Sequence, residues 1–228
     1  MKRYMLAVFI VLCTFQFAIA GPQGTSGRTA QTIIDNARGI FLNEDTADFW
    51  TDALLLKTLN YGVTQIASLT KCMEGNTQIN LTAGVSEYAI SGVSYISVEK
   101  VIFSGVTTDY TDDKPLTRSN ISSIDSGEDI EEPVRYYLWN DRIGLDPVPR
   151  TTDQNIIIYY VKLPSEIGLT GTVPLPAIYD YALTLFIAAK VFKRDAQDGR
   201  SQALEAEYVA ELTRYSSDLT ERLRATEK

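Results

Sequence analysis

The stretch at residues 135–167, RYYLWNDRIGLDPVPRTTDQNIIIYYVKLPSEI, decides the fold of this chain. Its alternating apolar residues predict a three-stranded meander, with strands at 134–139, 142–146 and 155–163. The Asn-Asp pair at 140–141 favours a tight turn between the first two strands, because both residue types tolerate positive φ. Nothing in this stretch resembles catalytic chemistry, so we interpret it as a scaffold.

The third strand of the meander is the strongest strand signal in the chain. One face carries Ile156, Ile158 and Tyr160, and the other carries Ile157, Tyr159, Val161 and Leu163. Two apolar faces predict a strand that is covered on both sides. The chain's own helices can cover one face. The second cover is either another layer of the same chain or a neighbouring subunit.

Helical patterns flank the β-rich part of the sequence. Apolar residues at three- and four-residue spacing predict helices at 29–41 and 47–69, and again at 177–194 and 201–225. The residues between them alternate with the period of strands. The predicted fold is therefore α+β, with N-terminal and C-terminal helices forming a helical bundle and an antiparallel β-sheet subdomain inserted at 77–163.

Local signals mark the ends of these helices. Thr46 or Asp45 can cap the second helix, and Asp198-Gly199 predicts the turn before the last one. Phe49 and Trp50 are expected on the apolar side of the second helix. Gly62 is a weak point within that helix, because glycine has a low helix propensity.

The first part of the insertion predicts three further strands. Residues 78–81 and 87–90 alternate around a turn at 83–86 and read as the first hairpin of the sheet. Residues 97–103 alternate next. Residues 105–133 are then a long polar insertion. Its carboxylates, which we interpret as a solvated acidic loop, are Asp109, Asp112, Asp113, Glu128, Asp129, Glu131 and Glu132.

Composition excludes several classes of function. A net charge of −8 disfavours a general nucleic-acid binder, because phosphate binding needs basic patches, although an acidic wall can still line a passage for DNA. The chain has no histidine, which removes Ser-His-Asp and Cys-His systems and histidine-ligated metals. Its two cysteines, Cys13 and Cys72, form no CxxC pair. We therefore expect no enzyme, no cofactor, and no catalytic or metal-binding residues.

The N-terminus has the pattern of a secretory signal peptide. In residues 1–20 a basic start precedes an apolar run and a small-residue Ala-Ile-Ala end. The run is short for a membrane span and is interrupted by Thr14 and Gln16, so no stable span is expected. Residues 21–28 follow as a flexible linker that is rich in glycine.

The order of motifs along the chain resembles the head–tail adaptor proteins of tailed bacteriophages, the connectors or tail accessory factors of short-tailed phages. These motifs are a tryptophan-containing helix, LTAGVSEY at 81–88, IGLDPVP at 143–149, YYVKLP at 159–164 and VPLP at 173–176. The resemblance makes residues 29–228 the adaptor domain. The motif residues expected to have structural roles are Trp50, Trp139, Leu145, Asp146, Pro147, Pro149, Tyr160 and Pro164.

This resemblance implies a structural protein of the virion. Members of that family form a homo-oligomeric ring, a dodecamer, that docks on the portal protein ring at the head–tail junction. The ring extends the DNA channel, lets DNA pass without sequence-specific binding, and presents an attachment surface to the tail or nozzle protein. Such proteins assemble in the bacterial host cytoplasm and need no export.

The signal-like leader conflicts with cytoplasmic assembly. Three explanations are open: a start codon placed too early, an uncleaved N-terminal extension, or an exported relative. The alternative function is therefore an exported bacterial binding or envelope protein, with the leader taken at face value.

The last predicted helix carries an apolar stripe along its whole length. The stripe consists of Leu204, Tyr208, Leu212, Tyr215, Leu219 and Leu223. The preceding helix can cover this stripe in an antiparallel pair. Because the last helix is about two turns longer, we expect Leu219 and Leu223 to project beyond that pair and to form an assembly contact.

The leader gives the first testable prediction. We expect residues 1–27 to pack against nothing in the folded domain, because the linker separates them from the first helix. Residues 28–228 should therefore melt at the same temperature as any longer soluble form in a circular dichroism scan. A fall of many degrees on removing the leader would contradict this.

Overall fold

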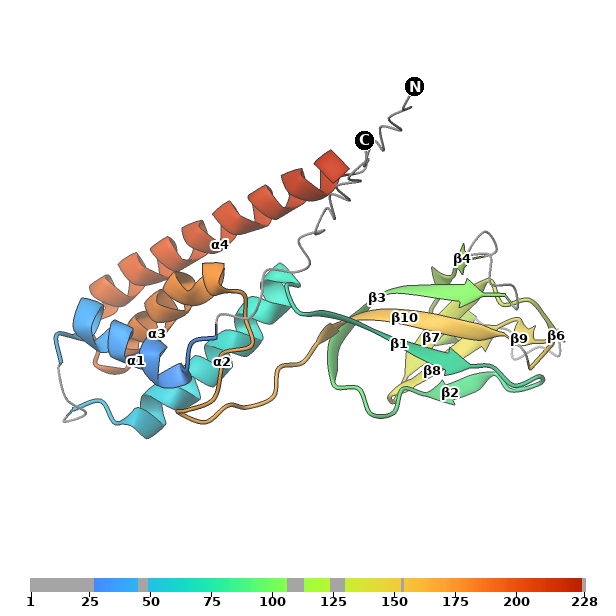
Figure 1. Ribbon diagram of the computed structural model, residues 1–228, viewed down its shortest axis with the longest axis horizontal. Helices are drawn as coiled ribbons and strands as arrows, with labels where there is room; N and C mark the ends of the chain where they lie inside the picture. Colours follow the sequence, from blue (N-terminus) through green and yellow to red (C-terminus); the bar gives the residue numbers. More distant parts are fainter. Residues whose placement is uncertain (1–26, 45–48, 106–112, 124–129, 153, 227–228) are drawn as a thin grey trace, which may run out of the picture.

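The computed structural model describes residues 27–44, 49–105, 113–123, 130–152 and 154–226, with side chains up to residue 215. In these ranges the chain forms four α-helices and ten strands, which confirms the α+β class. Figure 1 shows the helices at one end of an elongated molecule and the strands at the other. We call these parts the helical unit and the β unit. Residues 1–26, which hold the signal-like leader, lie outside the description.

The helical unit combines segments from both ends of the sequence. Its elements are α1 (Ala30–Ala37), the π-helical turn η1 (Arg38–Leu42), α2 (Asp52–Thr70), the 3₁₀ turn η4 (Ala177–Tyr179), α3 (Asp180–Arg194) and α4 (Asp198–Thr226). Thr29 caps α1, since its side chain accepts a hydrogen bond from the Thr32 amide. Residues of α1, α2, α3 and α4 share one buried apolar core.

Two predicted helix boundaries are wrong. The second helix begins at Asp52 after Thr51, so Phe49 and Trp50 precede it instead of lying on its apolar side. The predicted caps at residues 45 and 46 lie outside the description. Asp198-Gly199 forms the first turn of α4, because the chain already reverses at Ala196, which has a φ of 56°.

Helix α3 is the centre of the helical unit. Eleven of its residues are buried, and it packs against each of the other three α-helices. It approaches α2 closely at Gly62, where an added Cβ would lie 2.7 Å from Leu183 Cδ1 and 2.7 Å from Phe186 Cδ1. The glycine that looked like a weak point is therefore the residue that lets these two helices pack closely.

The β unit is a sandwich of two four-stranded sheets. The first has the order β1-β10-β3-β4 and the second β2-β8-β7-β5, while β6 and β9 form a small separate pair. The strands are β1 (Glu74–Asn80), β2 (Glu87–Ala89), β3 (Tyr95–Ser104), β4 (Lys114–Pro115), β5 (Thr117–Arg118), β6 (Ile130–Glu131), β7 (Arg135–Trp139), β8 (Arg142–Asp146), β9 (Val148–Pro149) and β10 (Asn155–Lys162). Most pairs are antiparallel, but β5–β7 and β6–β9 are parallel.

The predicted meander and the predicted first hairpin are both wrong in topology. Strands β7 and β8 do form a hairpin through residues 140–141, but β10 leaves that sheet and pairs with β1 and β3. Strands β1 and β2 likewise belong to different sheets. The physical reason is the shared core: Ile143 and Leu145 of β8 face Ile156 and Ile158 of β10 across the sandwich, not along one sheet.

The expected double cover of β10 is also wrong within this chain. Its inner face, with Ile156, Ile158 and Tyr160, is buried against the second sheet and not against helices. On its outer face Tyr159 is 37% exposed, although Val161 is buried near the end of α2. The alternative, that a neighbouring subunit supplies the second cover, remains a prediction.

Residues 105–133 are not a simple polar loop. Their described parts contain β4, β5, β6 and a short 3₁₀ turn, η3 (Ile121–Ser123). Leu116, between β4 and β5, is buried in the core of the sandwich. Strand pairing also ties this insertion to both sheets, because β4 pairs with β3 and β5 pairs with β7.

A two-stranded neck joins the two units, as Figure 1 shows. Strand β1 follows α2 directly, and β10 leads back to α3. The two strands pair antiparallel from Glu74↔Val161 to Asn80↔Asn155. At the end of β10 the Lys162 amide donates to the Met73 carbonyl at 2.7 Å. Beyond the strands, the Asn60 side chain donates to the Ile167 carbonyl and accepts from the Ile167 amide, both at 3.0 Å.

The close approach at Gly62 gives a testable prediction. Gly62→Leu should lower the free energy of unfolding by about 1–3 kcal/mol, because the new side chain overpacks the α2–α3 contact. Gly199→Leu is the matched control, since an added Cβ there meets no atom within 4 Å. Urea denaturation measures both. An unchanged or raised stability for Gly62→Leu would show that the two helices do not pack as described.

Candidate assembly surfaces

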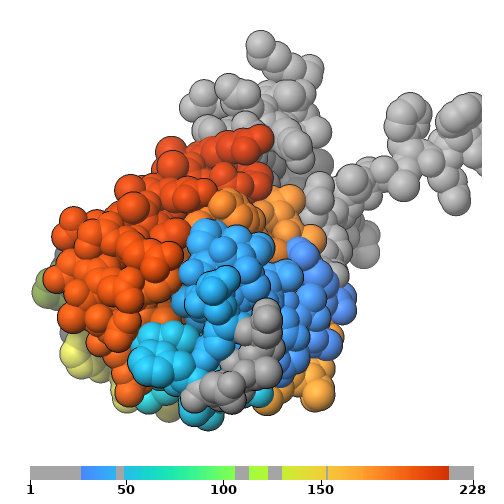
Figure 2. All heavy atoms as spheres, turned by 90° about the vertical axis from the view of Figure 1, so that its left-hand side faces the viewer, coloured from blue at the N-terminus to red at the C-terminus, as the bar shows by residue number. Residues whose placement is uncertain are grey.

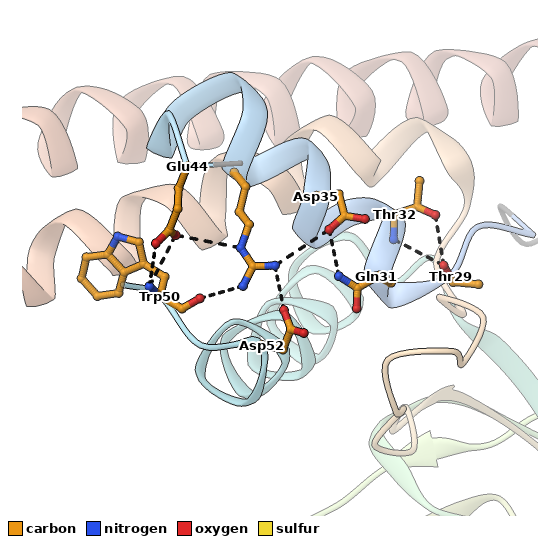
Figure 3. Close-up of polar contacts among 8 residues, drawn as sticks. Thr29, Gln31, Thr32, Asp35, Glu44, Trp50 and Asp52 are labelled. Atoms are coloured by element: carbon orange, nitrogen blue, oxygen red, sulfur yellow. Dashed lines mark hydrogen bonds and ion pairs between the residues drawn. The ribbon is translucent and has the colours of Figure 1, made fainter. Parts of the chain in front are cut away.

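A buried arginine organises the end of the helical unit. Arg38 of η1 is only 5% exposed. Its guanidinium donates to the Trp50 carbonyl at 2.6 Å and pairs with Asp52 Oδ1 at 2.7 Å, as Figure 3 shows. A buried cation is costly unless it is paired and hydrogen-bonded. Arg38 therefore fixes where the chain enters α2.

Glu44 holds the same segment from the other side. Its Oε1 accepts a hydrogen bond from the Phe49 amide at 2.5 Å. The same oxygen accepts a second one from the Trp50 amide at 3.1 Å (Figure 3). The Glu44 carboxylate also lies 3.9 Å from the Arg38 guanidinium. Arg38 and Glu44 precede positions 45–48 in the sequence, and both bind the backbone of residues that follow these positions.

This segment presents an aromatic pair at the end of the molecule. Trp50 packs partly against the helical core, whereas Phe49 is 68% exposed and meets the Trp50 ring edge-on at 4.7 Å. A hollow of about 380 Å³ adjoins them, lined by Phe49, Trp50, Thr51, Leu54, Arg194 and Asp195. Figure 2 views this end, where η1 (blue) and the start of α2 (cyan) lie beside the orange-red α4. We call it the helical end surface.

A second candidate surface lies on the outer face of the sheet β1-β10-β3. A hollow of about 460 Å³ is formed there by Lys71, Glu74, Gly75, Glu99, Lys100, Ile102, Tyr159, Tyr160 and Val161. Lys71 pairs with Glu99 at 2.5 Å, and Ser97 donates to the same carboxylate at 2.7 Å. These hydrogen bonds lower the pKa of Glu99 and keep it ionised. We call this feature the sheet hollow.

The predicted motif residues do not form one site. Trp50 belongs to the helical unit, whereas the other motif residues lie in the β unit or just after it. Leu145 and Tyr160 are core residues of the sandwich, and Asp146 pairs with Arg135 at 2.5 Å. Pro147, Pro149 and Pro164 are wholly or partly buried, and Trp139 is 60% exposed.

Comparison with protein families decides what kind of protein carries these surfaces. The model of the SU10 adaptor protein family matches residues 28–227. The chain belongs to the SU10 adaptor protein family. This confirms the resemblance to phage adaptors that the order of the motifs indicated. A search of curated proteins finds no match.

The packing of the Tyr137 ring against Gly144 was missed in the sequence analysis. Tyr137 and Gly144 are paired across β7 and β8, and a Cβ on Gly144 would lie 2.0 Å from the Tyr137 ring. The ring can cross this position only because glycine has no side chain. Tyr137 then donates to Glu87 Oε1 of β2 at 2.9 Å. Burial and this carboxylate raise the pKa of Tyr137 to about 12.

The acidic residues of the insertion are only partly described. Asp109, Asp112, Glu128 and Asp129 lie outside the description, whereas Glu132 pairs with Lys114 at 2.6 Å. Across the described residues, no three His, Cys, Asp or Glu side chains gather as a group that could hold a metal ion. None of the helices in those same ranges is long and apolar enough to cross a membrane.

The predicted assembly contact at Leu219 and Leu223 stays a prediction. Helix α4 reaches Thr226, but the side chains beyond residue 215 lie outside the description. Earlier in the stripe, Tyr208 and Leu212 are buried, and Leu204 and Tyr215 pack partly against the helical core.

The Arg38 network gives a testable prediction for the adaptor. Arg38→Lys should lower the free energy of unfolding by about 2–4 kcal/mol, because an ammonium cannot reach both Trp50 and Asp52 as the planar guanidinium does. Asp35→Asn is the control, since its exposed carboxylate lies 3.9 Å from Arg38, and it should cost under about 0.5 kcal/mol. Both substitutions are measured by thermal and urea unfolding. If Asp35→Asn destabilised the protein as much as Arg38→Lys, the role assigned to Arg38 would be contradicted.

Proposed function

We propose that this protein is a structural head–tail adaptor that docks as a ring on the portal vertex of a phage. The ring extends the DNA channel and provides the attachment surface for the tail. The observation that carries this proposal is the family match over residues 28–227. The protein works by burying complementary surfaces, and no covalent bond is made or broken.

The distribution of charge supports a passage for DNA and not a DNA-binding site. Residues 74–162 contain 14 acidic and seven basic residues, so the β unit carries −7 of the net charge of −8. Phosphate is repelled by such a surface, because binding would require clustered lysine and arginine. A ring with this unit near its channel lets DNA slide without holding it.

The two cores of the chain support a proposed division into parts. We propose that residues 29–228 are one adaptor domain, that residues 1–20 and 21–28 are a leader and a linker, and that helices from both ends of the sequence act as one bundle. The shared core of α1, α2, α3 and α4 supports this bundle. The β unit is then an insertion between α2 and α3.

The far end of α4 is the proposed contact with the portal. Helix α4 has 29 residues and α3 has 15, so α4 extends well beyond its partner, as Figure 1 shows. The described core contacts of α4 involve residues 204–215. Leu219 and Leu223 continue the same stripe. Burying each against a partner contributes about 1.5–3 kcal/mol.

Substitutions at this helix end test the proposal. Leu219→Asp combined with Leu223→Asp should leave circular dichroism and the melting temperature close to wild type but abolish co-sedimentation with the cognate portal ring. Val209→Asp is the matched control, because Val209 lies on α4 and is 58% exposed; it should keep binding.

Two results would contradict this assignment. Unfolding of the double variant would show that the stripe is core throughout its length. Undiminished portal binding by a folded double variant would show that another surface makes the contact.

A further inference from the structure

Trp139 is an exposed tryptophan on the outer face of the second sheet. It is the last residue of β7, and its side chain is 60% exposed. Its neighbours Tyr136 and Leu138 point into the sandwich core, so the alternation of the strand turns Trp139 outward. Its cross-strand partner is Arg142, which is largely exposed as well. A large apolar side chain held outward on a rigid strand is typical of an interface anchor.

The sheet hollow has the chemistry to receive an aromatic ring. Ile102, Tyr159 and Val161 supply apolar walls, and Lys100 lies at its side. Lys71 is neutralised by Glu99, but no ion pair of Lys100 occurs among the residues the structure describes. A lysine beside an apolar hollow can interact with the face of an indole ring, which is the strongest aromatic partner for a cation.

The two features lie on opposite faces of the same sandwich. Tyr159, Lys100 and Ile102 are on the outer face of one sheet, and Trp139 is on the outer face of the other. Because they point in opposite directions, one molecule cannot bring them together. Two copies stacked face to face can do so.

Both features also lie near the neck, at the same end of the sandwich. The Ile90 amide donates to the Asp141 carbonyl at 3.0 Å, which places the β7–β8 turn beside the end of β2. Only residues 90–94 separate β2 from β3, whose first residue, Tyr95, pairs with Lys162 of the neck. If a neighbouring copy has nearly the same orientation as the first, its Trp139 therefore lies at the same height along the sandwich as the hollow of the first copy.

Other exposed aromatic residues fit the hollow less well. Phe49 lies at the helical end surface, and Tyr61 and Tyr181 lie on helices α2 and α3. The Tyr181 hydroxyl is already held by Glu207 at 2.7 Å. Arg142 beside Trp139 is itself paired with Glu87 at 3.6 Å, so the choice of Trp139 rests on its indole ring, which interacts with a cation more strongly than a phenyl or phenol ring does.

We propose that Trp139 of each copy occupies the sheet hollow of the next copy, with Lys100 against its ring. The contact is head-to-tail, and such a contact closes a ring when the rotation between neighbouring copies divides a full turn evenly. It covers Tyr159 and thereby gives the outer face of β10 its second layer. The inference rests on the proposed ring function and names the surface that joins neighbouring subunits.

Two variants test this contact. Trp139→Ser removes the inserted side chain, and Lys100→Glu with Tyr159→Ser removes the cation and a wall of the hollow. Each should weaken ring formation at least tenfold, measured as mass by sedimentation velocity on portal rings and on the protein alone. Phe49→Ser is the matched control, because it removes an aromatic ring that is 68% exposed from the helical end surface, away from both features.

Mixing the two variants tests the direction of the contact. Each variant retains one of the two complementary surfaces, so an equimolar mixture should form a pair that cannot extend, whereas each variant alone stays monomeric. A symmetric contact would give no such rescue.

Several outcomes would overturn the inference, and they separate it from the proposed function. If both variants form rings on the portal like wild type, the inference fails and the proposed function stands. Equal loss with Phe49→Ser shows that the effect is not specific and also overturns it. If wild-type protein binds no portal and stays monomeric, both the proposed function and the inference fail.

Discussion

The pairing of β1 with β10 is the interaction on which the rest of the molecule depends. The chain enters the β unit through β1 and leaves it through β10. The seven residue pairs between these strands hold the entry and the exit side by side. As a result, α2 and α3, which are separated by more than a hundred residues, reach the same core. The two hydrogen bonds between the Asn60 side chain and the backbone of Ile167 secure the return to the helices.

This arrangement gives the adaptor rigid surfaces that carry exposed aromatic side chains. Arg38 and Glu44 hold Phe49 and Trp50 at the end of the helical unit, and the β7–β8 hairpin holds Trp139 on the sandwich. In each case buried polar contacts or paired strands fix the backbone beside an exposed aromatic side chain. An anchor of this kind loses little conformational entropy when it binds, which favours assembly through a few residues.

Outside residues 105–133, where strands replace the predicted polar loop, the sequence indicated the types of element but not their partners. The strands around Asn140-Asp141 and the helices around residues 177–225 could be predicted, because turn chemistry and apolar spacing are local. The sheet of β10 could not be predicted, because an alternating strand fits equally well beside β8 or across from it. Arg38 and Gly144 were missed for a related reason. Their roles depend on Trp50, twelve positions away, and on a contact between Tyr137 and Glu87 across fifty positions. The leader and the side chains of Leu219 and Leu223 lie outside the description.

The central claim is that this protein acts by assembling into a ring on a portal. The most direct test is the mass of wild-type protein incubated with its cognate portal ring, measured by mass photometry. We predict a single complex that contains one adaptor chain for each portal subunit. A folded protein that remains at the mass of one chain, beside portal rings of unchanged mass, would contradict the account.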